Sequence, residues 1–315
     1  MKLAERILAG DQRAIARGIS IVESESADAA VLVRQLFSRA GKARVIGVTG
    51  APGVGKSTLV DALATEWRRE GCGVGIIAVD PTSPFSGGAI LGDRIRMQTH
   101  AGDAGVYVRS MATRGQLGGL AHATGDAAVI LAAAGKDVVL IETVGVGQGE
   151  IEIARTADTS IVVTVPGTGD DIQALKAGIM EIGDIFVVNK SDRDGADRTV
   201  ADIEGMFALK ANEGVDWHPP VLKTQATTGE GVTELLETVR RLEVKRGDAV
   251  DRRRTRLRSR LYEILRRRFR EHVESRTELM LAVDGAVARM LEGDLDPYTA
   301  AEEIFARALR ESRDS

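Results

Sequence analysis

The chain has 315 residues, of which 43% are hydrophobic and 28% are charged, and its formal net charge at pH 7 is -4. This slightly acidic balance argues against nucleic acid or an anionic membrane as a partner, and an aromatic content of only 3% argues against a stacking surface for single strands. Cys72 is the only cysteine, which excludes an intrachain disulfide and a cysteine-based zinc site.

The N-terminal region, residues 1–42, has the apolar spacing of helices, with a polar break at 24–28 between two of them. We therefore expect a helical N-terminal extension. Its first residues, 1–6, have no hydrophobic signal core. The longest apolar stretch, 127–135, is too short to span a bilayer. These features favour a cytoplasmic protein.

A phosphate-binding loop follows the extension. The run Gly50-Ala-Pro-Gly-Val-Gly-Lys-Ser57 has a glycine, four residues and then Gly-Lys-Ser, between a β-prone run at 44–49 and a helix-forming run at 58–67. In this context backbone N–H groups and the helix N-terminus converge on phosphate oxygens. We expect Lys56 to reach the β- and γ-phosphates and Ser57 to bind Mg²⁺. The predicted nucleotide contacts here are Gly50, Ala51, Pro52, Gly53, Val54, Gly55, Lys56, Ser57 and Thr58.

Two of the later predicted strands, 73–80 and 137–142, each end in an acidic residue. The first ends in Asp80 and is followed by a polar segment that reaches Asp93, and we expect both carboxylates to contact Mg²⁺ or its water. The second ends in Glu142. Simple GTPases have Asp-x-x-Gly at this point, and a glutamate, one methylene longer, can still hold Mg²⁺ through a water.

Two residues that follow Glu142, Gly145 and Gln148, are candidates for sensing the γ-phosphate and for orienting the water that attacks it. Gly145 would let its N–H reach that phosphate and couple the loop to the nucleotide state. Gln148 lies three residues further on. It either orients the attacking water or has a structural role in the loop.

The sequence also carries a pattern for reading the base. The predicted strand 184–189 ends in Asn189-Lys190-Ser-Asp192. A carboxylate at Asp192 can accept from the ring N–H and the exocyclic amine of guanine, and adenine offers no such pair of donors. We expect Asn189 to brace the loop or touch the base, and the Lys190 stem to lie over the purine. Thr224, Gln225 and Ala226 resemble the last base-contacting loop of G proteins, so the pattern favours GTP over ATP.

Short apolar strands alternate with helical stretches from 43 to 245. This alternation predicts an α/β fold, a doubly wound and mostly parallel sheet of the P-loop NTPase type, flanked by helical N- and C-terminal extensions. All the motifs fall at the carboxyl ends of strands, where such sheets bind ligands. The predicted strands lie near 44–49, 73–80, 105–110, 137–142, 159–165, 184–189 and 219–224.

The C-terminal region, 246–315, shows only helical patterns, and Asp296 with Pro297 predicts the start of its last helix. Residues 246–270 contain eleven arginines. These arginines are either a nucleic-acid-binding arm or the polar face of an amphipathic arm that packs on a partner subunit. We favour the second interpretation, a helical dimerisation arm, because such charge runs are usually solvated helix faces.

Four longer segments resemble the signature sequences of the MeaB/ArgK family of G proteins, and the resemblance covers nearly the whole chain. It implies a homodimeric GTPase that acts as a chaperone of an adenosylcobalamin-dependent acyl-CoA mutase, chiefly methylmalonyl-CoA mutase. Such a protein gates cofactor delivery from a cobalamin adenosyltransferase and protects or reactivates the mutase. The four segments are 78–97, 110–120, 142–148 and 166–181.

The resemblance also implies roles for single residues. It places Asp80, Asp93 and Glu142 in the magnesium and switch machinery, and Lys176 on an additional switch that senses the nucleotide and the mutase. Two alternatives remain, an ATPase or kinase associated with basic amino-acid transport and a metallochaperone GTPase. The Asn189–Asp192 pattern argues against the first, and the scattered histidines argue against the second. The expected catalytic residues are Lys56, Asp93, Glu142, Gln148 and Lys176.

Overall fold

The computed structural model describes residues 2–24, 26–40, 43–80, 98–100, 102–112, 117–143, 156–167, 183–211, 218–245 and 249–311. The chain divides into two compact units, Met1–Arg256 and Leu257–Ser315. Each unit is described by itself.

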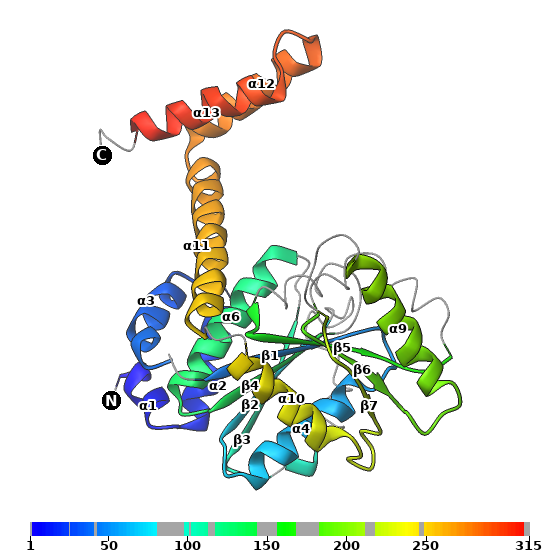
Figure 1. Ribbon diagram of the computed structural model, residues 1–315. Coiled ribbons are helices and arrows are strands. Elements are labelled where there is room, and N and C mark those ends of the chain that lie inside the picture. Colours follow the sequence, from blue (N-terminus) through cyan, green and yellow to red (C-terminus); the bar gives the residue numbers. More distant parts are fainter. Residues whose placement is uncertain are drawn as a thin grey trace. The chain divides into compact units, whose positions relative to one another are not determined.

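The first unit is built on one parallel sheet of seven strands in the order β3-β2-β4-β1-β5-β6-β7 (Figure 1). The predicted α/β fold and all seven predicted strands are confirmed. β1 lies between β4 and β5, so the chain changes direction across the sheet there, which is where doubly wound sheets bind ligands. The strands are β1 (Arg44–Thr49), β2 (Val74–Asp80), β3 (Val106–Ala112), β4 (Val138–Thr143), β5 (Thr159–Thr164), β6 (Ile185–Asn189) and β7 (Val221–Thr224).

Both faces of the sheet are buried, and successive side chains along a strand point to opposite faces. On β4, Leu140 enters the cluster under one face and Ile141 the cluster under the other. On β6, Val187 and Phe186 divide in the same way. Because helices cover both faces of a parallel sheet, its strands are continuously apolar rather than alternating with polar residues.

Helices α4 (Lys56–Arg69) and α10 (Val232–Lys245) cover one face, and Trp67 of α4 is fully buried there. On the other face, α6 (Leu117–Ala133) packs with the N-terminal helices under one half of the sheet, and α9 (Ala196–Ala211) covers the other half. The N-terminal region is helical as predicted. Its elements are α1 (Leu3–Leu8), α2 (Gln12–Glu23), α3 (Ala27–Leu36) and the short η1 (Phe37–Arg39), and a second short helix, η2 (Gln98–His100), precedes β3.

The second unit is helical, as its sequence predicts. Here α11 (Ala249–Glu274), which begins in the first unit, is followed by α12 (Thr277–Glu292) and α13 (Pro297–Glu311). Helix α12 ends at Gly293 in a left-handed conformation, φ 81°, which glycine adopts without steric cost. Asp296 caps α13 by accepting from the backbone N–H groups of Tyr298 and Thr299, so the predicted helix start is confirmed. Among the helices in the described ranges, none is long and apolar enough to cross a membrane.

At the amino-terminal ends of the strands, Arg68 joins α4 to the start of β3. Its guanidinium forms an ion pair with Asp103 at 2.8 Å and donates to the Cys72 carbonyl at 2.7 Å. The Asp103 carboxylate also accepts from the backbone N–H of Gly105 at 2.8 Å. The Arg68 hydrogen bond, helped by that backbone donor, lowers the pKa of Asp103 from 3.8 to about 2.

This pair predicts an acid-sensitive contribution to stability. A carboxyl group with a lowered pKa in the folded state stabilises fully above its unfolded pKa of 3.8, and loses that contribution as the pH falls toward 2. D103N should therefore melt at a lower temperature than the wild type at pH 7, and the difference should shrink below pH 4. Thermal unfolding from pH 7 to pH 3 checks this, with the exposed Asp202→Asn as control. A difference that stays constant with pH would contradict it.

Candidate functional site

The predicted site residues that the structure describes gather at one edge of the sheet. The loop 50–55 joins the end of β1 to the start of α4. Glu142 lies at the end of β4, Asn189 ends β6, and Thr224 ends β7. The parallel sheet brings these ends together because all of its carboxyl termini point the same way.

Close packing explains two glycines of the loop. Gly50 has φ 144°, and a Cβ atom there would lie 2.1 Å from the Val163 carbonyl oxygen of β5. Gly55 has φ 95°, and a Cβ atom there would lie 2.5 Å from Nδ2 of Asn189. Neither position accommodates a side chain. Between them Val54 is buried in the core and fixes the loop to the sheet.

The first turn of α4 supplies the charged end of the site. Lys56 is buried, and its Nζ donates to the carbonyl oxygens of Gly50 and Ala51, at 2.8 Å each. The amino group therefore lies against the inside of the loop that would enclose phosphates. A helix N-terminus adds backbone N–H groups and partial positive charge at the same place.

Ser57 and Glu142 form the part of the site that fits a metal. The Ser57 hydroxyl donates to Oε1 of Glu142 at 2.6 Å, and both residues are buried. A hydroxyl beside a carboxylate is the kind of oxygen donor set that Mg²⁺ prefers, with water filling its other positions. The residues present therefore fit the predicted magnesium. In the described segments no group of three or more His, Cys, Asp or Glu side chains could hold a metal.

A hydrogen bond that the sequence did not predict supports this pair. The Thr143 hydroxyl, next to Glu142, donates to the Thr49 hydroxyl at 3.0 Å, and both are buried. It fixes the end of β4 against the end of β1, directly before the phosphate-binding loop. Two threonines at the ends of adjacent predicted strands are the only signal of it in the sequence.

Asn189 braces the segment 189–192 that is predicted to read the base, called the base-reading loop below. Its side-chain amide donates to the Val54 carbonyl at 2.9 Å, and its Oδ1 accepts from the Thr224 hydroxyl and the Ala226 backbone N–H, at 3.1 Å each. Only 2% of the residue is exposed. The sequence left two roles open for Asn189, and these contacts are those of a brace. Thr224 and Ala226 are thereby held beside Asn189.

The two residues predicted to contact the base follow the brace. Lys190 has a left-handed backbone, φ 56°, which is uncommon outside glycine. Its Nζ donates to the Gly53 carbonyl at 2.7 Å, so its stem runs from the base-reading loop to the phosphate-binding loop. Asp192 is exposed beyond the turn, where its carboxylate is open to a ligand. Gln225 turns back toward Glu230 through a backbone hydrogen bond of 3.0 Å.

The structure leaves part of the predicted site undescribed. The end of β2 pairs with β4 through Val79 and Thr143, which puts the Asp80 backbone at the same edge as Glu142. Its side chain lies outside what the structure describes. Four further predicted residues also lie outside the described ranges: Asp93, Gly145, Gln148 and Lys176.

Comparisons with known proteins agree with this geometry. The model of the family described as "Methylmalonyl Co-A mutase-associated GTPase MeaB" matches residues 15–278. A protein of Pyrococcus horikoshii that bears a provisional GTPase name is 48% identical over 311 residues, 97% of this chain and 97% of the relative. The mouse protein named "Methylmalonic aciduria type A homolog, mitochondrial" is 31% identical over 324 residues, 96% of this chain and 78% of the relative.

A solved structure shares the fold. The crystal structure titled as a LAO/AO transport system kinase superposes with a TM-score of 0.70 and 24% sequence identity, covering 96% of this chain and 95% of that one. At this identity the likeness shows the fold alone.

The close packing at Gly50 predicts a selective loss of nucleotide binding. A positive φ strains alanine at either glycine, but only at Gly50 would the added Cβ also collide with the β5 backbone. We expect G50A to lower GTP affinity by at least about tenfold. Titration with a fluorescent GTP analogue measures it. The control is G71A, at φ 83° with no atom within 4 Å of a Cβ, in the turn beyond the end of α4; equal affinity losses in both variants would contradict the packing argument.

Proposed function

The chain belongs to the family of methylmalonyl Co-A mutase-associated GTPases, MeaB, and from that membership we propose that its hydrolysis of GTP serves an adenosylcobalamin-dependent acyl-CoA mutase. The proposed partner is a methylmalonyl-CoA mutase, which the protein would load with cofactor and protect or reactivate. The family description names that mutase, and the name of the mouse relative refers to methylmalonic aciduria. Both names support the proposal.

The observation that carries the nucleotide chemistry is the bracing of the phosphate-binding loop against the base-reading loop. Asn189 and Lys190 each donate to a carbonyl of the phosphate-binding loop, Val54 and Gly53. The end that binds phosphate and the end that binds guanine are therefore held in one fixed relation. A bound GTP would be positioned by both ends at once, and such positioning supplies much of the catalysis in phosphoryl transfer.

Each residue then has a task in hydrolysis. Lys56 would exchange its two loop carbonyls for the β- and γ-phosphate oxygens and neutralise their charge. Ser57 and Glu142 would hold the magnesium ion, which supplies further charge neutralisation when bound. In the chain after β4, we propose that the Gly145 N–H contacts the γ-phosphate and that Gln148 orients the attacking water.

Coupling to the partner is the second half of the proposal. We propose that Asp80, Asp93 and Lys176 respond to the γ-phosphate and pass its presence to the mutase. If nucleotide state changes the affinity for the mutase, the mutase must change the affinity for nucleotide by the same factor. A mutase that orders these contacts would thereby also raise the hydrolysis rate.

We further propose that the protein is a cytoplasmic homodimer that also interacts with a cobalamin adenosyltransferase. The second unit supports a subunit contact. Of the sixteen large hydrophobic side chains that are exposed among the described residues, eleven lie between 257 and 315. Exposed apolar residues at this density mark interaction surfaces.

The proposed reading of guanine predicts a change of base preference. In D192N the side chain offers one acceptor and one donor instead of two acceptors, which mismatches guanine and matches xanthine, whose exocyclic amine is replaced by a carbonyl. D192N should lose GTP affinity by about a hundredfold and gain affinity for xanthosine triphosphate. Competition of GTP, ATP and xanthosine triphosphate against a labelled nucleotide measures both. An unchanged preference for GTP would mean that another group reads the base. Tight binding of ATP to the wild type would instead support the alternative of an ATPase or kinase associated with basic amino-acid transport.

The mutase proposal predicts partner-dependent turnover. GTP hydrolysis by the purified protein should be slow alone and should rise by about tenfold or more with methylmalonyl-CoA mutase from the same organism, because the partner would complete the site. Phosphate release measures the rate, and K56A, which lacks the phosphate-binding amino group, should stay inactive in both conditions. If the mutase leaves the rate of GTP hydrolysis unchanged while K56A remains inactive, this mutase is not the partner, but the protein is still a GTPase.

A further inference from the structure

We propose that helix α13 is a self-complementary contact, which pairs antiparallel with α13 of a second copy about a two-fold axis at Ala306. In this arrangement Glu302 of each copy forms an ion pair with Arg310 of the other. The inference rests on the proposed homodimer and names the surface through which two copies recognise each other.

The outward face of α13 carries the argument. Ala300 and Ala308 are buried, and α13 packs on α12. The opposite side of the helix carries Glu302, Ala306 and Arg310, which follow one another at intervals of four residues and therefore lie along one ridge. Glu302 and Arg310 are exposed, and the short Ala306 lies midway between them.

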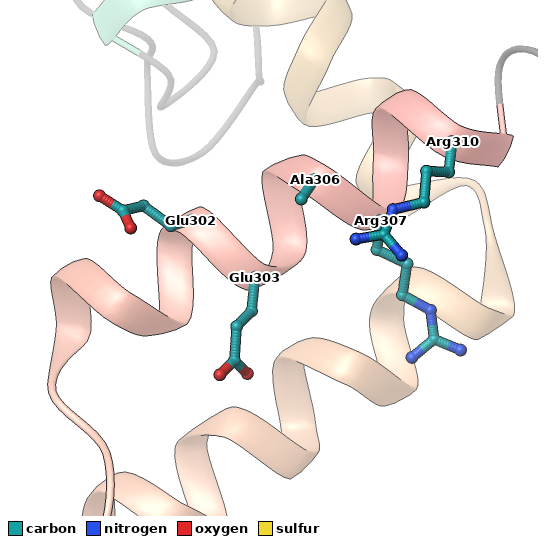
Figure 2. A pocket seen from close by; sticks show the side chains of 5 residues that line it. All are labelled: Glu302, Glu303, Ala306, Arg307 and Arg310. Atoms are coloured by element: carbon teal, nitrogen blue, oxygen red, sulfur yellow. The ribbon is translucent and has the colours of Figure 1, made fainter.

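The charges on this ridge are divided between its two ends. Figure 2 shows Glu302 and Glu303 toward one end of the helix, Arg307 and Arg310 toward the other, and Ala306 between them. The five residues line an open hollow of about 510 Å³. Two antiparallel copies of such a helix place acid opposite base at both ends, and a small residue at the crossing allows the axes to approach closely.

The adjacent acidic residue, Glu303, already has a partner within the chain. Glu303 forms an ion pair with Arg289 of α12 at 3.2 Å. In the part of the chain that the structure describes, no ion pair involves Glu302 or Arg310. They lie eight residues apart, about 12 Å along the helix, so they cannot pair with each other. A second copy supplies the missing partner for both.

An apolar stripe runs beside the charged ridge. Tyr298, Phe305 and Leu309 lie seven and four residues apart, which puts them on one side of the helix. They are 84%, 50% and 53% exposed, and one side of the Phe305 ring already packs on Phe269 of α11, with ring centroids 5.2 Å apart. Burial of these side chains would supply the favourable free energy of the contact, and the two ion pairs would fix its direction and register.

Charge exchange tests the pairing directly. E302R places two arginines opposite each other at both ends of the proposed contact, and R310E does the same with two glutamates. Each variant should raise the dimer dissociation constant by about tenfold or more. The double variant E302R/R310E restores opposite charges only between copies, so it should return to within about threefold of the wild type. Sedimentation velocity over a concentration series measures all four proteins, and basal GTP hydrolysis should be unchanged in all of them.

A cross-link tests the axis. In a C72A background, A306C puts two thiols at the proposed two-fold axis, where a disulfide between copies should form on mild oxidation. The matched control is A301C, an exposed alanine on the same helix that points about 140° away from position 306. Non-reducing electrophoresis should show a dimer for A306C and little for A301C.

The outcomes separate this contact from the rest of the proposed function. A wild-type dimer with no rescue in the double variant and equal cross-linking of both cysteines would overturn the α13 contact while the homodimer stands. A monomeric wild type would overturn both. Rescue together with selective cross-linking would support the contact even if methylmalonyl-CoA mutase fails to stimulate hydrolysis.

Discussion

The buried amide of Asn189 is the interaction on which the site depends. Its three hydrogen bonds join segments that are far apart in the sequence: the phosphate-binding loop, the end of β7 and the turn after β7. A buried amide that lost one of these partners would retain an unsatisfied donor or acceptor, which costs about 1–3 kcal/mol. The side chain therefore tolerates only the arrangement in which all three segments are in place. In the proposed function, recognition of the base and of the phosphates would therefore depend on the same arrangement of these three segments.

The same constraint explains why the loop before α4 contains glycine where it does. Gly55 passes directly beside the Asn189 amide, and Gly50 passes directly beside β5. A glycine loop between a strand and a helix N-terminus can present backbone N–H groups to a phosphate. The Ser57–Glu142 hydrogen bond then aligns the helix with the end of β4. Packing, rather than intrinsic strength of any single group, gives the site its geometry.

Much of this could be predicted from the sequence, because its signals are local. The strand 44–49 was predicted with the bounds that the structure gives, and the phosphate-binding loop is one uninterrupted run. Strand ends were less certain, and the predicted strand at 219–224 begins at Val221, because pairing with β6 decides where the ladder starts. The role of Asn189 could not be decided, since its partners lie up to 135 residues away. The sequence likewise could not show which face of α13 is exposed, because that depends on which side of the helix α12 covers.

The N-terminal helices have a consequence for how the chain is made. Ile15, Ile19 and Leu36 are fully buried, and the residues that bury them include those of α6, about a hundred positions later in the chain. During synthesis the amphipathic N-terminal segment leaves the ribosome long before α6 exists. Contacts among the N-terminal helices can form early, but their packing against α6 has to wait until α6 has been synthesised.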